Sequence, residues 1–317
     1  MSGNPDPQLA FVFPGQGSQS TGMLAELADA HAIIRETFAQ ASDGAGLDLW
    51  ALAQGGAEVM LNRTEYAQPA LLAAGIAVWR TWLHAGGAEP CVLSGHSLGE
   101  YTALVAAGAI ALDDAAHLVR IRGQAMQDAA PHGFGSMAAI IGLEDEVVEA
   151  ACRDISGDRV VAPANYNSPG QIVVGGHVQA VDAAIALLSE RGARKAVKLN
   201  VSVPSHTSLM REAANRVAEA MAAYSWHAPR IPVIQNVDGK VHGDVAAIRN
   251  ALTRQLYLPV RWSECVRSAI AAGGRRIGEC GPGKVLCGLI RRIDRTIDSR
   301  ALGTPGEFDS ALADWRM

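Results

Sequence analysis

A serine stands in the middle of residues 95–99, Gly95-His96-Ser97-Leu98-Gly99, which fit the pattern G-x-S-x-G. A short apolar stretch precedes this segment at 91–94, and a stretch rich in Ala and Leu follows it at 100–107, so we expect strand, turn and helix to meet here. Such a sharp turn lifts a serine hydroxyl out of a sheet, and its glycines let neighbouring backbone pass without Cβ clashes. Ser97 is therefore a candidate nucleophile, although an ordinary glycine-rich turn with a capping serine explains the same pattern.

A serine hydroxyl needs a base to act as a nucleophile, and nine histidines are candidates. His206 follows Val203-Pro204-Ser205 and precedes a helix expected from about residue 209, so we expect it in a loop where its ring can point into a cleft. A lone histidine in a loop is more often simply exposed. No Asp or Glu placed like the acid of a Ser-His-Asp triad can be singled out after Ser97, so the residues do not predict a full triad.

Two glycine-rich segments resemble nucleotide-binding loops, and both are better explained as turns. The segment at 15–20 follows an apolar strand at 9–13 but carries Ser20 where a dinucleotide fingerprint has its last glycine. The segment at 278–284 fits G-x-x-x-x-G-K, yet Val285 stands where a hydroxyl would bind magnesium. Nicotinamide binding and kinase or ATPase activity are therefore disfavoured, and we expect Gly281-Pro282-Gly283 to cap a following helix.

The order of the expected elements predicts an α/β protein with two units. The middle of the chain reads as β-α-β-β-α-β, with strands at 137–143, 160–164, 171–174 and 196–199 and helices at 145–153 and 178–190. This order is that of the ferredoxin-like split unit, which can close as a small layer of helices on a sheet. We therefore predict a large α/β domain from 1–132 and 200–317, with an inserted ferredoxin-like subdomain at 133–199.

The composition of the 317 residues, 49% hydrophobic and 19% charged, excludes a disordered or collagen-like chain. No apolar run approaches the ~18 residues of a membrane span, and the first residues do not read as a signal peptide, so we expect a cytoplasmic protein without a membrane partner. The five cysteines form no C-x-x-C pair, which predicts neither a disulfide framework nor a zinc site.

The formal net charge of −5 conceals a basic segment at 240–300, which holds 12 Lys or Arg residues against 5 Asp or Glu residues. A positive segment on an otherwise acidic protein could face a negatively charged partner, although a few solvated helix faces are the commoner explanation. No nucleic acid is expected as a partner.

Spaced motifs along nearly the whole chain together resemble, in order, the signatures of the malonyl-CoA:acyl carrier protein transacylases of bacterial fatty acid synthesis. A run of several motifs is far more specific than any one of them. The motifs are Phe13-Pro14-Gly15-Gln16-Gly17-Ser18-Gln19, Gly95-His96-Ser97-Leu98-Gly99-Glu100-Tyr101, Arg122-Gly123 with Met126, Asn165-Tyr166-Asn167-Ser168-Pro169-Gly170-Gln171, Val203-Pro204-Ser205-His206, Gln255-Leu256-Tyr257 with Pro259-Val260, and Gly281-Pro282-Gly283-Lys284-Val285-Leu286.

The resemblance implies a hydrolase-like core built on a parallel sheet, with an inserted ferredoxin-like subdomain. It implies that Ser97 carries the acyl group and that His206 is its base, oriented by a main-chain carbonyl near Gln255 rather than by a carboxylate. The backbone N–H groups of Leu98 and Gln16 would form the oxyanion hole, a role that needs only backbone placement.

For the remaining residues the resemblance implies substrate binding. Arg122 would bind the free carboxylate of a malonyl group through its guanidinium, whereas without the resemblance it would be a solvated cation on a helix. His96 would shape the pocket, and Asn165 would stabilise the Asn-rich turn in which we expect it. Malonyl-CoA and holo-acyl carrier protein are the implied substrates of a monomer that needs no metal or redox cofactor. A thioesterase-like serine hydrolase and a non-catalytic carrier-protein docking module are the competing functions.

Overall fold

The larger of two sheets is wholly parallel in the computed structural model, which describes residues 5–55, 58–131, 133–201 and 203–315. Its strands lie in the order β7-β2-β1-β8-β9, and each neighbouring pair runs parallel. Their bounds are β1 Asp6–Phe13, β2 Pro90–Gly95, β7 Val233–Ile234, β8 Arg276–Glu279 and β9 Asp298–Ala301.

Both faces of this sheet are buried, because side chains of each strand alternate between two hydrophobic clusters. Leu9, Phe11 and Phe13 of β1 pack into one cluster, and Ala10 and Val12 pack into the other. Helices cover the first face: α1 Ala25–Ala30, α2 Ile33–Ala45, α3 Leu49–Gly55, α4 Glu58–Leu61, α5 Thr64–His84, α6 Leu98–Ala106, α7 Leu112–Asp128, α10 Arg211–Met221, α11 Val245–Gln255 and α14 Pro305–Trp315. The second face is covered by α12 Trp262–Ala271 and α13 Val285–Ile293.

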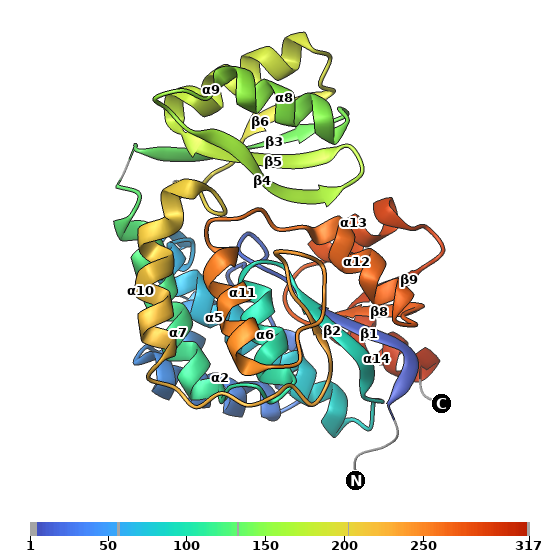
Figure 1. Cartoon of the computed structure of the whole chain (residues 1–317). Helices are drawn as coiled ribbons and strands as arrows, with labels where there is room; N and C mark the ends of the chain where they lie inside the picture. Colours follow the sequence, from blue (N-terminus) through green and yellow to red (C-terminus); the bar gives the residue numbers. More distant parts are fainter. Residues whose placement is uncertain (1–4, 56–57, 132, 202, 316–317) are drawn as a thin grey trace.

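The smaller sheet is antiparallel and has the strand order β4-β5-β3-β6. In chain order its elements are β3 Gly135–Ile141, α8 Asp145–Ile155, β4 Val161–Ser168, β5 Gln171–His177, α9 Val178–Glu190 and β6 Lys195–Lys198. The sheet stands over one end of the core and carries α8 and α9 on its far face (Figure 1). The predicted fold class, a parallel-sheet α/β core with a ferredoxin-like subdomain, is confirmed. The domain limits at 133 and 199 stay a prediction.

Strand β4 joins the small sheet to the core. The backbone N–H of Tyr166 donates to the carbonyl oxygen of Val260 at 2.9 Å, and the N–H of Val260 donates to Ala164 at 2.9 Å. These bonds make a parallel bridge between Asn165 and Val260. The bridge fixes one edge of the small sheet against the loop that follows α11.

The same pairing corrects one expectation. Asn165 was expected in an Asn-rich turn after a strand ending at residue 164, but β4 continues to Ser168 and only Pro169 and Gly170 form the turn. Pairing with Val260 on one side and with β5 on the other extends the strand, so Asn165 lies within it. Its role as a turn-stabilising residue is therefore wrong.

Two loops also take the shapes expected from their glycines and flanking residues. Gly281 and Gly283 both have positive φ and precede α13, so this segment is a turn ahead of a helix as predicted. After β6 the chain returns to the core, passes His206, and forms the short 3-10 helix η1 Ser208–Met210 directly before α10. No helix within the described ranges is long and apolar enough to span a lipid bilayer.

Candidate active site

Ser97 sits at a sharp turn between β2 and α6. Its backbone has φ 53° and ψ −107°, a conformation that costs free energy for any residue other than glycine. The turn is so tight that a Cβ on Gly95 would lie 1.9 Å from the carbonyl oxygen of Gly99, and one on Gly99 would lie 2.0 Å from that of Phe13. Both glycines are therefore sterically required, and the helix begins at Leu98, directly after the serine.

His206 lies against this serine, from a loop more than a hundred residues along the chain. Its Nε2 atom is 2.8 Å from Ser97 Oγ, and its Nδ1 atom is 2.6 Å from the carbonyl oxygen of Gln255. Because a carbonyl only accepts hydrogen bonds, the imidazole proton lies on Nδ1 and Nε2 is left to accept the serine proton. Burial, and then the positive charge of Arg122, lower the pKa of His206 to about 3, so the ring is neutral near pH 7.

Arg122, on α7, is 1% exposed, so its description as a solvated helix cation is wrong. Its Nη1 donates to Gln68 Oε1 at 2.8 Å, and its Nη2 donates to Gln255 Oε1 at 2.9 Å and to Ser97 Oγ at 3.2 Å. Burial lowers the pKa of the Arg122 guanidinium. No carboxylate is among these hydrogen-bond acceptors, and a buried cation held by neutral amides favours an anion beside the serine.

These groups line a cavity of about 300 Å³. Met137 and Val173 of the small sheet form part of its wall, and Leu286 and Leu289 of α13 form another part, so the small sheet and the core both contribute. A mainly apolar cavity with a few convergent polar groups is the usual form of a small-molecule site. Apart from Gln255, which touches Arg122 and His206 from behind, the predicted site residues all line it: Gln16, His96, Ser97, Leu98, Arg122, Asn165 and His206.

The loop after β1 lies against the serine turn, where Gln16 and Leu98 were expected to supply N–H groups. The His96 N–H donates to Phe13 at 2.9 Å, and a Cβ on Gly15 would come within 2.5 Å of the His96 carbonyl oxygen. Among the residues that the structure describes, the backbone N–H groups of Gln16 and Leu98 have no acceptor. Both are thus available to an oxygen atom of a ligand in the cavity.

His96 and Asn165 line the wall of the cavity. The Nε2 atom of His96 is 2.9 Å from Asn167 Oδ1, and its ring packs on Trp262 with centroids 5.4 Å apart. Burial lowers the pKa of His96, so this ring is neutral too. Asn165 is 6% exposed and lies on β4.

Sequence analysis missed four polar residues that hold the site together: Gln68, Glu100, Asn167 and Asn236. Glu100 gave a signal, because it is an acidic residue directly after the G-x-S-x-G segment in a stretch that otherwise reads as a buried helix. Asn167 lies within the Asn165–Gln171 motif but was given no role there, and nothing in the local sequence marks Gln68 or Asn236.

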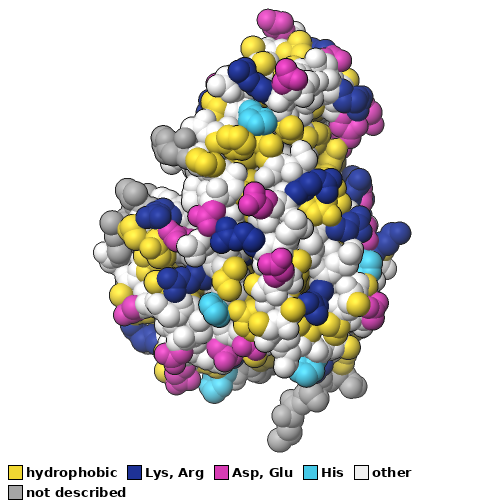
Figure 2. Space-filling view, turned by 60° about the vertical axis from the view of Figure 1, so that its left-hand side comes forward, with side chains coloured by type: hydrophobic (Ala, Val, Ile, Leu, Met, Phe, Trp, Pro, Cys, Tyr) yellow, Lys and Arg dark blue, Asp and Glu magenta, His cyan; other side chains and the backbone are white. Residues whose placement is uncertain are grey.

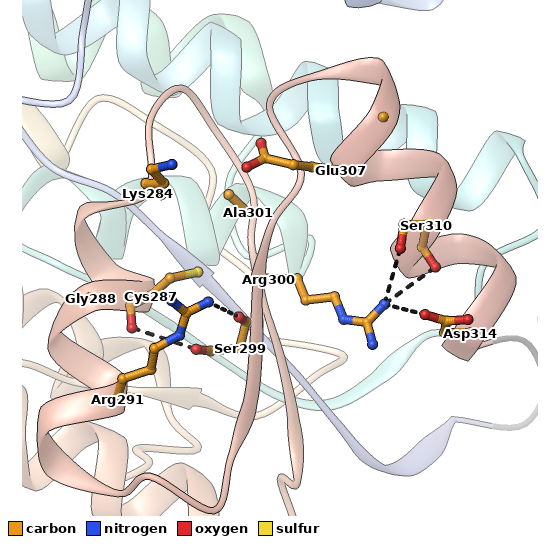
Figure 3. Close-up of a pocket in the computed structure, with 11 residues that line it drawn as sticks. Lys284, Cys287, Gly288, Arg291, Ser299, Arg300, Ala301, Glu307, Ser310 and Asp314 are labelled. Atoms are coloured by element: carbon orange, nitrogen blue, oxygen red, sulfur yellow. Dashed lines mark hydrogen bonds and ion pairs between the residues drawn. The ribbon is translucent and has the colours of Figure 1, made fainter.

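A second hollow, of about 720 Å³, lies between α13, β9 and α14 and is not built like a reaction site (Figure 3). Arg300 donates to Asp314 Oδ2 at 2.5 Å, and Arg291 donates to the carbonyl oxygen of Ser299 at 3.2 Å, so both cations are already engaged (Figure 3). Within the described parts of the chain, no three His, Cys, Asp or Glu side chains are grouped as metal ligands.

A serine that faces a neutral imidazole after a parallel strand, beside a buried cation, is the arrangement of α/β enzymes that transfer acyl groups through serine. The chain belongs to the acyl transferase family: the family model described as an acyl transferase domain matches residues 10–292. This result confirms the resemblance found in the sequence motifs.

Individual relatives within this family match nearly the whole chain. The chain is 52% identical to the malonyl CoA-acyl carrier protein transacylase of Salmonella typhimurium, over 96% of this chain and 99% of the relative. A crystal structure of malonyl-CoA:acyl carrier protein transacylase from Xanthomonas oryzae is 65% identical, with a TM-score of 0.98 over 99% of this chain and 100% of that one. A malonyl-transacylase in complex with its holo type II PKS acyl-carrier protein is 47% identical, with a TM-score of 0.95 over 97% and 99% of the two chains.

Proposed function

We propose that the protein transfers a malonyl group from malonyl-CoA to the phosphopantetheine thiol of holo-acyl carrier protein, through a malonyl ester on Ser97. One observation carries the proposal: Ser97 Oγ lies 2.8 Å from His206 Nε2 and 3.2 Å from Arg122 Nη2, between a base and a cation. The names of the relatives support malonyl-CoA and acyl carrier protein as the two substrates.

In the first transfer His206 Nε2 accepts the hydroxyl proton while Ser97 Oγ forms a bond to the thioester carbonyl carbon. The carbonyl oxygen becomes negatively charged and is stabilised by the N–H groups of Gln16 and Leu98. The C–S bond then breaks, and CoA leaves as a thiol with the proton that His206 returns. The Gln255 carbonyl keeps the imidazole in the required tautomer throughout and takes the place of a triad carboxylate.

The second transfer runs in the opposite direction with a different thiol. His206 accepts the proton of the phosphopantetheine thiol, whose sulfur attacks the ester carbon, and Ser97 Oγ recovers a proton as it leaves. Arg122 binds the free carboxylate of the malonyl group in both steps, while His96 and Asn165 shape the wall around the acyl chain. These steps balance without electron transfer, so no redox cofactor is needed, and we also propose that no metal takes part. We also propose a monomeric, cytoplasmic enzyme.

Intact-mass spectrometry tests this function directly. Mixing the protein with malonyl-CoA should add one malonyl group, and holo-acyl carrier protein should remove it and gain the same mass. A serine hydrolase would lose the adduct to water before the carrier protein is added, and a non-catalytic docking module would form no adduct. Either outcome would contradict the proposed function and support the corresponding alternative.

A further inference from the structure

A buried carboxylate beneath Ser97 takes no part in the two transfers. Glu100, on α6, is 0% exposed. Its Oε2 atom accepts hydrogen bonds from Gln255 Nε2 at 3.0 Å and from the backbone N–H of Asn236 at 2.9 Å. Its Oε1 atom has no partner among the residues described. Burying a charged group costs free energy, so a carboxylate at this position calls for a specific explanation.

The first contact of Glu100 fixes the orientation of an amide. Gln255 Oε1 accepts from Arg122 Nη2 at 2.9 Å, while Gln255 Nε2 donates to Glu100 and to the carbonyl oxygen of Ser97, the latter at 2.9 Å. A flipped amide would place its NH₂ group against the guanidinium and its oxygen against the carboxylate, and both contacts would be repulsive. Glu100, together with the Ser97 carbonyl oxygen, thus favours the orientation in which Gln255 Oε1 faces Arg122.

The second contact supports the serine turn itself. Asn236 Oδ1 accepts from the Ser97 N–H at 2.7 Å, and Asn236 Nδ2 donates to the Gly95 carbonyl oxygen at 2.7 Å. Backbone groups at a sharp turn cannot all pair within a strand or helix, so these two take a side-chain partner. Glu100 holds Asn236 through its backbone N–H and therefore touches both supports of the nucleophile.

We propose that Glu100 is a positioning residue for acyl selection: through Gln255 it holds the Arg122 guanidinium where it can bind an acyl carboxylate beside Ser97. The inference rests on the proposed function and adds to it. An acetyl group has no carboxylate and does not depend on the position of Arg122. Loss of the Glu100 carboxylate should therefore impair malonyl transfer more than acetyl transfer, which a loss of packing alone would not do.

The test is Glu100→Gln, compared with wild type for kcat/KM with malonyl-CoA and with acetyl-CoA. Both are measured at pH 8, above the raised pKa of Glu100 of about 7, so that the wild-type side chain is ionised. An amide at position 100 can keep both contacts only through a neutral oxygen, with its NH₂ in the unpartnered place of Oε1, so it holds Gln255 without the charge of the carboxylate. We expect the malonyl-to-acetyl ratio to fall about tenfold, mainly through a higher KM for malonyl-CoA, as for the loss of one charge-assisted hydrogen bond.

The matched control is Glu279→Gln. Glu279 is also 0% exposed and also accepts two hydrogen bonds, here from the backbone N–H groups of Leu286 at 3.1 Å and Cys287 at 2.8 Å, but it does not touch Arg122 or Gln255. This control measures the general cost of neutralising a buried carboxylate, and its malonyl-to-acetyl ratio should stay at the wild-type value.

A double-variant cycle tests whether Glu100 acts through Gln255. Gln255→Met should lower the ratio with Glu100 intact, and adding Glu100→Gln should lower it little further, because Glu100 acts through Gln255. A ratio unchanged in Glu100→Gln overturns the selection role of Glu100, even if both rates fall equally. If wild type itself does not prefer malonyl-CoA or forms no adduct, the proposed function fails instead, and this is seen before any variant is measured.

Discussion

Ser97 and His206 are joined by a single hydrogen bond, and their removal should have different consequences. Ser97→Ala should abolish both the malonyl adduct and turnover, because the hydroxyl oxygen forms the covalent bond. His206→Ala should keep the fold and slow acylation by about 10² to 10⁴-fold, as for a lost general base. Intact-mass spectrometry and stopped-flow release of CoA measure the two effects. An adduct on the Ser97→Ala variant would place the nucleophile elsewhere.

Arg122 should decide between acyl groups. Arg122→Ala should nearly abolish malonyl transfer and let acetyl-CoA compete, because no cation is left to pair with the malonyl carboxylate. The rate of malonyl transfer by Arg122→Lys should lie between those of wild type and Arg122→Ala. An ammonium keeps the charge but lacks the planar fork that reaches Gln68, Gln255 and Ser97 at once. The measurement is kcat/KM for both thioesters.

The control for Arg122 is Arg216→Ala, which breaks an exposed ion pair with Asp128 whose Nη1 to Oδ2 distance is 2.8 Å. Exposed ion pairs contribute little to stability, so this variant should keep the wild-type rates. An unchanged malonyl-to-acetyl ratio in Arg122→Ala would leave the guanidinium with a structural role only.

At the scale of elements, the serine turn depends on glycines that cannot carry a Cβ. Gly99→Ala should destabilise the protein by several kcal/mol, because the new atom would lie 2.0 Å from the Phe13 carbonyl oxygen and must push β1 or α6 aside. Gly288→Ala, on α13, meets nothing within 4 Å and should stabilise its helix by about 0.5 to 1 kcal/mol. Urea unfolding measures the free energy of unfolding of both variants and of wild type. A Gly99→Ala variant as stable as wild type would mean that the turn is not tightly packed.

The stability of the protein should depend on pH through Glu100, on helix α6. Burial, opposed by hydrogen bonds from Gln255 and Asn236 and by the charge of Arg122, raises the pKa of Glu100 from 4.5 to about 7, and Asp238 adds to the rise. Between these values the native state keeps a proton that the unfolded state releases, so stability falls as pH rises through this window. Glu100→Gln lacks this proton and should gain about 3 kcal/mol relative to wild type between pH 4.5 and 7. Urea unfolding at both pH values tests this, and a constant difference between the two proteins would contradict it. His206 titrates in both proteins, so its own contribution cancels in the comparison.

Elements with local signals were predictable, and elements that depend on distant partners were not. The helix Val178–Glu190 has the bounds expected from its sequence, and the apolar strand before Ser97 is also found. Strand β7 has only two residues and is defined by its pairing with β2, so no sequence pattern predicts it. The same holds for the far end of β4, which depends on Val260.

Within the site the same distinction applies. Ser97 has a motif, and the family motifs assign His206, Arg122 and the carbonyl near Gln255. The contact of Gln68 with Arg122 arises only when α5 packs against α7, and both contacts of Asn236 arise only when the loop after β7 meets the serine turn. Polar residues that support other site residues contact them only in the folded protein. Their positions in the sequence therefore follow no motif or regular spacing.

Across the whole molecule the charged residues are mixed rather than separated. On the face in Figure 2 the small lobe projects from the larger body, and Lys, Arg, Asp and Glu side chains are interspersed over both. Part of the basic segment is already paired: Arg276 with Asp6 at 2.7 Å, and Arg261 with Glu264 at 2.8 Å. Others, such as Arg267 and Arg295, are exposed and have no ion-pair partner within the described residues. These unpaired cations are the ones available to a negatively charged partner.

If those cations steer the carrier protein, its KM should rise with salt more than the KM for malonyl-CoA does, because exposed charges are screened beyond about 8 Å at physiological ionic strength. Reversing the charge in Arg267→Glu and Arg295→Glu should raise the carrier-protein KM and reduce its salt dependence, while the adduct with malonyl-CoA still forms at the wild-type rate. Arg35→Glu is the control, since Arg35 is an exposed arginine of the acidic part of the chain, paired with Asp29. Equal salt sensitivity for both substrates would count against docking by this segment, because CoA is an anion too and would respond to any general positive field.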